Sequence, residues 1–402
     1  MTILHTADWH IGKRLHKHYL YTDFDLFIGW LCDLVVERKI DVILISGDIF
    51  DLANPSAEAR KQYYQALIAL NKLNCHLIIT GGNHDSPSML DAPKDLLSAL
   101  KVSVIGGLPE NMEDCIIPLP NSEQAEVVIA ALPYLRDADI RRSEEGQTYE
   151  DRLAAIRTGI QARFDEAAEV CQSKYPEVPA IAMGHLYAAG ASSSESERDI
   201  QIGNQAAFHA EQFNSHFRYI ALGHIHQPQR VNSSVPTYYS GSPLMLSFSE
   251  RSDEKRVLLL DTSNDLTAES IQIPKFRQLL KISGTLEKIK ENLADLKPKG
   301  HLDSLIEIEM LEKDYSTKKL AGLDELVSHF NKATFEIVKH RTSFENQQKQ
   351  SSEVFGHKQN LEDLKPKEVF DSLLNEQSFS EEEKQELRQT FDELNELLHT
   401  ES

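Results

Sequence analysis

The sequence predicts an α/β fold that contains a second β-sheet of mixed direction. Residues 1 to about 275 alternate short apolar, β-branched runs with longer helical stretches, which is the order expected when strands and helices follow one another along a chain. Helices are predicted at 56–73 and 149–172, between runs that have the composition of buried strands. Later runs, at 237–240 and 256–261, follow one another with short turns, and this favours the second sheet.

Five of the predicted strands end in a polar patch. The strands are 3–6, 42–46, 76–80, 180–183 and 219–222, and the patches are Asp8-x-His10, Gly47-Asp48, Gly82-Asn83-His84-Asp85, Gly184-His185 and Gly223-His224-x-His226. Ligands of an open α/β sheet bind beyond the carboxyl ends of its strands, so patches that are distant in sequence are expected to form one site. Glycines directly before the polar residues permit the sharp turns that direct side chains inward.

The residue types in these patches indicate a metal site. Carboxylates, an amide oxygen and imidazoles are the ligands that borderline divalent metals prefer, and two such cations side by side are the usual device for hydrolysing a phosphate ester. The alternative is that the residues are unrelated, because a single Gly-Asp or Gly-His pair is uninformative and an isolated histidine such as His5, His76 or His209 is expected in a core or on a surface. The joint order of the five patches at strand ends favours the metal site.

Length and composition are those expected of a cytoplasmic enzyme. A chain of 402 residues is too long for one ordinary core, so two or three domains are expected. No stretch approaches the ~20 apolar residues of a membrane helix, and a secretory leader is not expected because its cleavage would remove Asp8. The four cysteines are far apart and form no Cys-x-x-Cys pair, which favours reduced thiols over disulfides or a zinc site.

The pattern changes after the predicted main domain, residues 1–275. Residues 276–342 predict a small α/β domain that packs on a larger one; its elements are a strand at 279–282, a helix at 286–296, a strand at 305–310, a helix at 323–330 and a strand at 334–338. Residues 343–360 are rich in Gln, Ser, Asn and Lys and have the composition of a linker. Residues 361–402 predict a pair of amphipathic helices, the second of which begins with a capping box formed by Ser380 and Glu383.

The patches resemble the calcineurin-like metallophosphoesterase superfamily, whose Gly-Asp-x-x-Asp element is present here at 47–51. Longer segments are similar to the SbcD family of bacterial nuclease subunits, which takes part in repairing DNA double-strand breaks. These segments are 6–12, 197–203, 221–226 and 240–244. They extend to about residue 260, and beyond that point the resemblance rests on the layout of the chain. The resemblance implies two mixed β-sheets packed face to face with helices outside, and a small domain at 276–342 that caps the nuclease domain.

The resemblance also implies a ligand set for two divalent metal ions, with manganese as the expected metal, although nitrogen-rich sites also accept iron or zinc. It assigns Asp8, His10, Asp48 and His226 to the first ion and Asp48, Asn83, His185 and His224 to the second, so that Asp48 bridges them. His84 is then expected to protonate or orient the leaving oxygen, with Asp85 as a partner that fixes its ring. Asp51 is expected to support the ligands or to face the DNA.

The activity implied by the resemblance is that of a metal-dependent DNA nuclease. It would degrade duplex ends from 3′ to 5′ and nick single strands or hairpins in DNA repair, replication and recombination. The implied partner is an SbcC-like ABC-type ATPase with a coiled coil, within a complex in which the nuclease is a homodimer. This chain has no Gly-x-x-x-x-Gly-Lys-Ser/Thr loop of its own, which agrees with a separate ATPase chain.

The terminal helices are the predicted binding site for that ATPase, although they could instead fold against their own domain. The polar linker before them favours the partner. Their predicted contact residues are Phe370, Leu373, Leu387, Phe391 and Leu394.

The net charge of −21 is unusual for a protein that binds DNA alone, because such proteins normally carry a basic stripe. Either the acidic excess is local, or a partner holds the DNA. Basic residues do occur near the predicted site. They are Lys13, Arg14, His16, Lys17 and His18, which are the predicted DNA-binding residues, together with Arg136, Arg141 and Arg142. The alternative for any such cluster is that it is only a solvated face.

Three other functions are compatible with parts of the pattern. A phosphatase or small-molecule phosphodiesterase would share the dimetal core, but serine/threonine phosphatases of the superfamily carry an arginine after Gly-Asp-x-x-Asp, where this chain has Leu52 and Ala53. A non-catalytic scaffold would have lost ligands, and none is missing from the pattern here. A nuclease that acts without a partner would not need the terminal helices.

Overall fold

The computed structural model describes residues 1–140, 149–192, 196–197, 207–297 and 300–344, together with residues 370, 374, 384, 387, 388 and 390. The chain forms two compact units. The first comprises Met1–Leu280, Lys297–Glu307 and Lys332–Val338, and the second comprises Lys281–Leu296, Ile308–Asn331 and Lys339–Ser402. Among the residues described, no helix combines the length and the apolar composition needed to cross a membrane.

The first of two six-stranded sheets has the order β14-β13-β1-β4-β5-β6. Its strands are β1 Thr2–Thr6, β4 Val42–Ser46, β5 His76–Thr80, β6 Val102–Ile105, β13 Arg256–Asp261 and β14 Glu269–Gln272. β1, β4, β5 and β6 run parallel, whereas β13 and β14 are antiparallel to their neighbours. The carboxyl ends of β1, β4 and β5 therefore lie at one edge of the sheet.

The second six-stranded sheet has the order β11-β12-β10-β9-β8-β7. Its strands are β7 Ile116–Leu119, β8 Val127–Ala131, β9 Ala180–His185, β10 Phe217–Gly223, β11 Gln229–Val231 and β12 Thr237–Tyr239. The four central strands are parallel, and the edge strands β7 and β11 are antiparallel. The mixed direction of both sheets confirms the predicted fold class.

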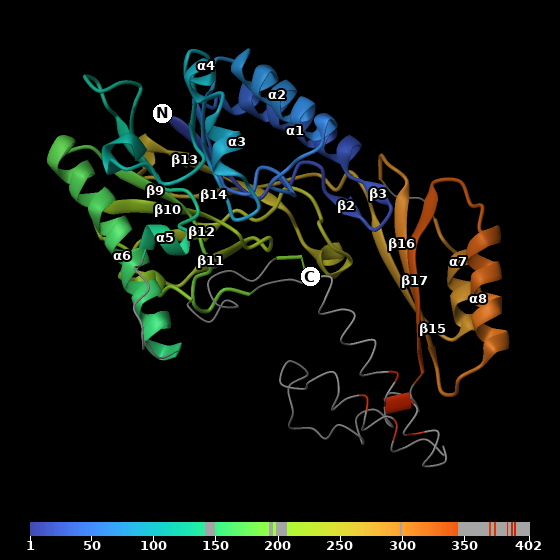
Figure 1. Cartoon of the computed structure of the whole chain (residues 1–402). Coiled ribbons are helices and arrows are strands. Elements are labelled where there is room, and N and C mark those ends of the chain that lie inside the picture. Colours follow the sequence, from blue (N-terminus) through green and yellow to red (C-terminus); the bar gives the residue numbers. More distant parts are fainter. Residues whose placement is uncertain are drawn as a thin grey trace. The chain divides into compact units, whose positions relative to one another are not determined.

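The cores explain why the strands are apolar on both faces. Along β4, Val42 and Leu44 pack in a cluster with Met183 of the other sheet, whereas Ile43 and Ile45 pack in a cluster with the helices that cover the first sheet. Those helices are α1 Tyr21–Arg38 and α2 Ala57–Asn71, and α6 Tyr149–Lys174 covers the second sheet (Figure 1). Strands buried on both sides lose the alternating pattern of half-exposed strands. The two sheets thus pack face to face with helices outside, as the sequence led us to expect.

The remaining elements of the first unit are short. They are the hairpin β2 Arg14–Leu15 and β3 His18–Tyr19, the helices α3 Pro87–Asp91, α4 Lys94–Ser98 and α5 Asp137–Ile140, and 3-10 turns at Met112–Cys115, Ala210–Gln212, Phe248–Ser252 and Thr262–Asn264. The predicted helix at 56–73 is α2, whose first turn is capped by the Ser56 hydroxyl accepting from the amide of Ala59. The predicted helix at 149–172 is α6.

A three-stranded sheet follows, with the order β15-β16-β17. Its elements are β15 Leu279–Gly284, α7 Leu286–Ala294, β16 Ser304–Glu312, α8 Thr317–His329 and β17 Phe335–Phe344. The predicted order of strands and helices is confirmed, but the predicted start of the second helix at 323 is wrong. That helix begins six residues earlier because the Ser316 hydroxyl caps it by accepting from the amide of Lys319. The capping role of this region stays a prediction.

Most of the predicted linker and of the C-terminal helices, including Leu373, Phe391 and Leu394, lies outside the described residues. Phe370 and Leu387 are described, and both are helical.

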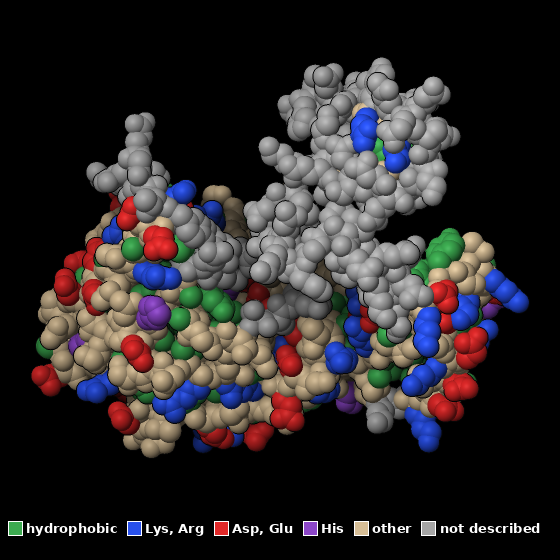
Figure 2. Space-filling model, turned by 90° about the horizontal axis from the view of Figure 1, so that it is seen from below, with side chains coloured by type: hydrophobic (Ala, Val, Ile, Leu, Met, Phe, Trp, Pro, Cys, Tyr) green, Lys and Arg blue, Asp and Glu red, His purple; other side chains and the backbone are tan. Residues whose placement is uncertain are grey.

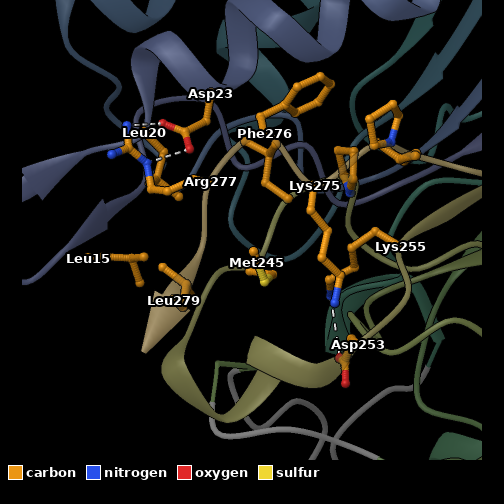
Figure 3. Close-up of a pocket in the computed structure, with 14 residues that line it drawn as sticks. Leu15, Leu20, Asp23, Met245, Asp253, Lys255, Lys275, Phe276, Arg277 and Leu279 are labelled. Carbon is orange, nitrogen blue, oxygen red and sulfur yellow. Dashed lines mark hydrogen bonds and ion pairs between the residues drawn. The ribbon is translucent and has the colours of Figure 1, made fainter. Parts of the chain in front are cut away.

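A buried ion pair fastens the segment before β15 to α1. The Arg277 guanidinium donates two hydrogen bonds to the Asp23 carboxylate, at 2.7 and 2.9 Å, and both side chains are almost fully buried (Figure 3). The surrounding side chains are mainly apolar and enclose a cavity of about 30 Å³. Two parallel N–H···O bonds to one carboxylate are the strongest form of this interaction, so the pair fixes the position of the chain between β14 and β15.

We expect Asp23→Ala to lower the free energy of unfolding by about 3–5 kcal/mol, because the substitution leaves the buried Arg277 charge without its partner. Urea denaturation followed by circular dichroism measures the change. Asp33→Ala is the matched control, since Asp33 lies on the same helix but is exposed, and it should change the free energy by no more than about 0.5 kcal/mol. Equal destabilisation by the two variants would contradict the role given to the ion pair.

Candidate metal centre

The polar patches of both sheets meet at one place because their loops are joined by backbone hydrogen bonds. The amide of Asp8, after β1, donates to the carbonyl of Gly47, after β4, at 3.1 Å. The amide of His10 donates in the same way to the carbonyl of Asp48, at 3.0 Å. A third bond crosses between the sheets, where the backbone amide of His224 donates to the side-chain carboxylate of Asp8 at 2.8 Å. The strand-end patches predicted to converge are therefore neighbours.

Four residues of the site have a backbone conformation that residues other than glycine rarely adopt. The φ angles of Asp8, His10, Asp48 and His224 are +54°, +44°, +48° and +98°. Each such residue costs about 1–3 kcal/mol and persists only where the surrounding structure enforces it. Their concentration in one site indicates that the fold stabilises this arrangement of side chains at the expense of local backbone energy.

Two glycines allow the loops to approach closely. A Cβ atom on Gly82 would overlap the carboxylate and the amide of Asp48, and one on Gly223 would overlap the carbonyl of Ser46. Both glycines are the first residues of their patches, which agrees with the sequence-based expectation that glycine precedes the functional side chains. Any larger residue at these two positions would force the strand ends apart.

Asp8, His10 and His226 form the first group of candidate ligands. All three are buried, and one donor atom of each lies within 4.8 Å of the others. The Nε2 atoms of His10 and His226 are 3.1 Å apart, and their rings are nearly perpendicular. Carboxylate and imidazole donors this close together, from the segments after β1 and β10, are ligands that can hold a divalent metal ion.

Asn83, His185 and His224 form the second group. The amide oxygen of Asn83 lies 2.9 Å from Nε2 of His185 and 3.3 Å from Nδ1 of His224. Nδ1 of His185 donates to the carbonyl of Ser46 at 3.1 Å, and because a carbonyl can only accept, this bond leaves Nε2 of the neutral ring as the electron-pair donor. The amide oxygen and imidazole nitrogens thus face one another as predicted.

Asp48 lies between the two groups. Its Oδ2 atom is 3.6 Å from Nε2 of His10 and 3.4 Å from Nε2 of His185. Its other oxygen accepts the amide hydrogen of His84 at 2.9 Å, which fixes the rotation of the carboxylate. Asp48 therefore occupies the position that a bridging carboxylate needs.

The donor set fits a metal ion for a second reason. Asp8 Oδ2, an oxygen of one of the candidate ligands, is buried and has no hydrogen-bond partner in the structure. A buried polar atom without a partner is destabilising by about 1–3 kcal/mol, and such atoms are rare in native proteins. A bound cation at this cluster would satisfy donors of this kind.

The protonation states of the cluster link metal binding to pH. Burial raises the pKa of the Asp8 carboxyl to about 7 and lowers the pKa of His10 to about 3. Burial also opposes protonation of His185, but the Asp48 carboxylate outweighs burial and raises the pKa of His185 to about 9. In the absence of metal, His185 therefore carries a proton at neutral pH and Asp8 is partly protonated. Metal binding has to displace these protons and should weaken as the pH falls.

The three residues predicted as catalytic lie beside the cluster. Nδ1 of His84 donates to the backbone carbonyl of Asp51 at 2.8 Å, and the His84 ring stands edge-on to that of His10, with centroids 4.7 Å apart. His84 also lies within ligand distance of His10 and Asp48. Both oxygens of Asp85 accept backbone amides, those of Ile49, Phe50 and Gly82. Asp85 thus fixes the loops after β4 and β5, while the Asp51 carbonyl holds the His84 ring.

The predicted DNA-binding residues lie in the β2–β3 hairpin or next to it, and they differ in their contacts. The Lys13 ammonium pairs with the Asp51 carboxylate at 3.1 Å, and the His18 ring pairs with Glu336 at 2.9 Å. The Arg14 guanidinium lies over the ring of Tyr19, and the ring of His16 stacks on Phe248. Lys17 is exposed. Arg141 and Arg142 lie outside the described residues.

Sequence reasoning missed the network that holds His226. Nδ1 of His226 lies 2.6 Å from the Ser196 hydroxyl, which in turn donates to the Glu250 carboxylate at 2.5 Å. Glu250 is buried and also accepts from the Lys255 ammonium at 2.6 Å. The Lys255 ammonium donates as well to the carbonyl of His226 at 2.9 Å. No sequence signal pointed to these residues, because Glu250 and Lys255 lie in a polar stretch that resembles a surface loop.

Residues 1–228 match the family model described as calcineurin-like phosphoesterase, and residues 275–378 match the one described as Type 5 capsule protein repressor C-terminal domain. The chain is similar to three relatives that are named as the SbcD component of the nuclease SbcCD. That of Escherichia coli K12 is 30% identical over 401 residues, which cover 97% of each chain. That of Rhodobacter capsulatus is 34% identical over 294 residues, 70% of this chain and 71% of the relative. That of Bacillus subtilis is 31% identical over 286 residues, 70% of this chain and 72% of the relative.

Gly82→Ala should lose bound metal, because the added Cβ would displace the Asp48 carboxylate from between the two ligand groups. The measurement is the number of metal ions retained per chain after dialysis, determined by elemental analysis. Gly29→Ala is the control, since Gly29 lies in α1 and a Cβ there would meet nothing within 4 Å. Full retention of metal by a folded Gly82→Ala protein would contradict this account of the site.

Proposed function

The chain belongs to the calcineurin-like phosphoesterase family and to its SbcD branch, and we propose that it hydrolyses DNA phosphodiester bonds as the metal-dependent nuclease component of an SbcCD-type complex. The observation that carries the proposal is the buried cluster of carboxylate, amide and imidazole donors centred on Asp48. A phosphatase or small-molecule phosphodiesterase with the same core is not favoured, because the similarity to the SbcD nucleases covers nearly the whole chain.

Two divalent ions fit the two ligand groups. Asp8, His10 and His226 would hold one ion, Asn83, His185 and His224 the other, and Asp48 would bridge them. The mixture of oxygen and nitrogen donors suits manganese, which we propose as the metal in use. When bound, two such ions lower the pKa of a water molecule and stabilise the negative charge that grows on the phosphate.

His84 has the position of a general acid for the leaving oxygen. Its Nδ1 hydrogen is held by the Asp51 carbonyl, so Nε2 is the atom that takes up and releases the proton used in the reaction. The Asp51 carboxylate pairs with Lys13 and lies 3.4 Å from Nδ1 of His10, so it supports the orientation of that ring. Asp85 acts through the backbone, because it fixes the loop that carries Asn83 and His84.

The DNA substrate and its processing are inferred from the family. We expect degradation of duplex ends from 3′ to 5′ and endonucleolytic cleavage of single strands and hairpins, in DNA repair, replication and recombination. A cytoplasmic location follows from a DNA substrate in a bacterial cell, and the free state of all four cysteines supports it.

The charge of the chain supports a partner that holds the DNA. With a net charge of −21, the chain alone has little of the electrostatic attraction that supplies non-specific DNA affinity. Figure 2 shows Lys and Arg side chains interspersed with Asp and Glu over the described part of the face it draws. The partner is an SbcC-like ABC-type ATPase whose coiled coil binds the region of Phe370 and Leu387, and ATP is expected to control the access of duplex DNA to the site.

An exposed apolar surface on α2 and α4 suits a second copy of the chain. Tyr64 and Ile68 of α2 are 38% and 49% exposed, and Leu96 and Leu100, in and after α4, are 71% and 42% exposed. The two helices adjoin, since the Asn71 side chain at the end of α2 donates to the carbonyl of Leu100. Exposed apolar side chains on adjoining helices are typical of an interface, and one patch that contacts itself gives a symmetric dimer.

The nuclease proposal is tested by incubating the purified chain with labelled hairpin and linear DNA, with and without manganese. We expect cleavage by the wild type and a loss of about 10²–10⁴-fold in His84→Ala, because its general acid is removed while the ligand groups stay in place. Asp48→Ala should lose both activity and bound metal. Hydrolysis of p-nitrophenyl phosphate without any cleavage of DNA would favour the phosphatase instead.

The dimer proposal predicts that Leu96→Asp converts a dimer into a monomer, because the charge would be buried at the interface. Sedimentation velocity measures the change. Leu311→Asp is the control, since Leu311 is 41% exposed in β16, which contributes no residue to this surface, and the variant should sediment like the wild type. A wild-type monomer at micromolar concentration would contradict the proposal.

A further inference from the structure

Residues 134–136, which follow β8, are fastened at both ends to the loop that carries Asn83 and His84. The amide of Tyr134 donates to the carbonyl of Gly81 at 2.8 Å. The Arg136 guanidinium donates through Nη2 to the carbonyl of Asp85 at 3.1 Å. Since Asp85 directly follows His84, the second bond ties the guanidinium to the residue after the predicted general acid.

The hydrogen bond that holds Arg136 does not neutralise its positive charge. Its hydrogen-bond acceptor is an uncharged carbonyl, and among the described residues no carboxylate forms an ion pair with the guanidinium. Lys13, on the β2–β3 hairpin, is different because its ammonium pairs with the Asp51 carboxylate at 3.1 Å. The residue Arg136 is exposed, and a guanidinium has five N–H donors, so donors remain for a ligand that arrives from solvent.

Tyr134 packs residues 134–136 against the candidate metal ligands. Its ring stands edge-on to that of His185, with centroids 6.2 Å apart, so it contacts a candidate metal ligand directly. Burial and the neighbouring Asp137 carboxylate raise the pKa of the Tyr134 phenol, which therefore stays neutral. The amide of Arg136 donates to the Asp139 carboxylate at 2.8 Å and thereby begins α5. The backbone around Arg136 is thus fixed on both sides relative to the cluster.

We propose that Arg136 binds a phosphate of the DNA backbone that neighbours the phosphodiester being cut, an inference that rests on the proposed nuclease function. A planar guanidinium presents parallel N–H donors that match the oxygens of a phosphate. The scissile phosphate belongs to the ligand cluster, and Arg136 is bonded one residue beyond His84, so the group it meets is the next phosphate along the strand. Arg136 is therefore a specificity residue, which favours polynucleotides over esters that carry a single phosphate.

The test compares two substrates that differ in the number of phosphates. Single-stranded DNA offers neighbouring phosphates, whereas bis(p-nitrophenyl) phosphate has only the one that is hydrolysed. Arg136→Ala should raise KM for DNA by about 10- to 100-fold, the loss of a charged hydrogen-bonded contact. It should lower kcat/KM for DNA about tenfold more than kcat/KM for bis(p-nitrophenyl) phosphate, because a mere displacement of the loop that carries His84 would lower both equally. The dependence of log KM on log salt concentration should also become shallower by about one unit.

Arg218→Ala is the matched control. Arg218 is exposed at the start of β10, whereas the ligands His224 and His226 follow the end of that strand, so the variant changes the net charge equally without touching the site. Its KM for DNA should stay within about twofold of the wild type, and Arg136→Lys, which keeps the charge, should restore part of the affinity lost in Arg136→Ala. Equal KM values for Arg136→Ala and Arg218→Ala on DNA would overturn the inference. If the wild type cleaves bis(p-nitrophenyl) phosphate but no DNA, the proposed function fails instead.

Discussion

The site depends on how closely the strand ends of the two sheets approach each other. Ser46, at the end of β4, makes this contact twice: its hydroxyl donates to the carbonyl of Ala221 at 3.0 Å, and its carbonyl accepts from Nδ1 of His185 at 3.1 Å. Buried His5 adds a second bridge, with its ring nitrogens 3.0 Å from the Tyr219 hydroxyl and 3.2 Å from the Leu222 carbonyl. Such hydrogen bonds between apolar sheets are strong because no water competes for them. They set the spacing across which ligands from both sheets meet.

This spacing explains why strained residues and an unpaired atom lie at the same place. The loops have to turn sharply within one or two residues of the sheet contact, which forces Asp8 and Asp48 into the left-handed region. The side chains then point at one another, and Asp8 Oδ2 is left without a partner. Both effects destabilise the chain without metal, by about 1–3 kcal/mol for each residue or atom involved. A cation bound at this cluster would offset part of this cost and would thereby couple metal binding to folding.

The sequence predicted those parts of the site that depend on local structure. A polar patch after an apolar strand is visible in the chain itself, and the parallel order of strands fixes where it lies; Asp48 and His185 were found in this way. Glu250 was not assigned a role, and Arg136 was named only as one of several basic residues near the site, since the contacts that position them come from a hydroxyl or a carbonyl of a distant segment. The start of α8 was predicted too late because the apolar pattern begins at Leu323, whereas the local cap at Ser316 starts the helix at Thr317.

The outer nitrogens of three histidines show how the fold prepares the site before any metal arrives. Nδ1 of His185 is held by the Ser46 carbonyl, that of His84 by the Asp51 carbonyl, and that of His226 by the Ser196 hydroxyl backed by Glu250. Each bond fixes the rotation of its ring, and the carbonyl partners also select the tautomer. The entropy cost of fixing the rings is then part of folding, so it does not weaken the binding of metal or substrate. The Ser46 and Asp51 carbonyls lie at the end of β4 and in the loop that follows it, whereas Ser196 and Glu250 come from later segments. A shift of the loop after β4 would therefore disturb His185 and His84 together, so one segment positions both a proposed ligand and the proposed general acid.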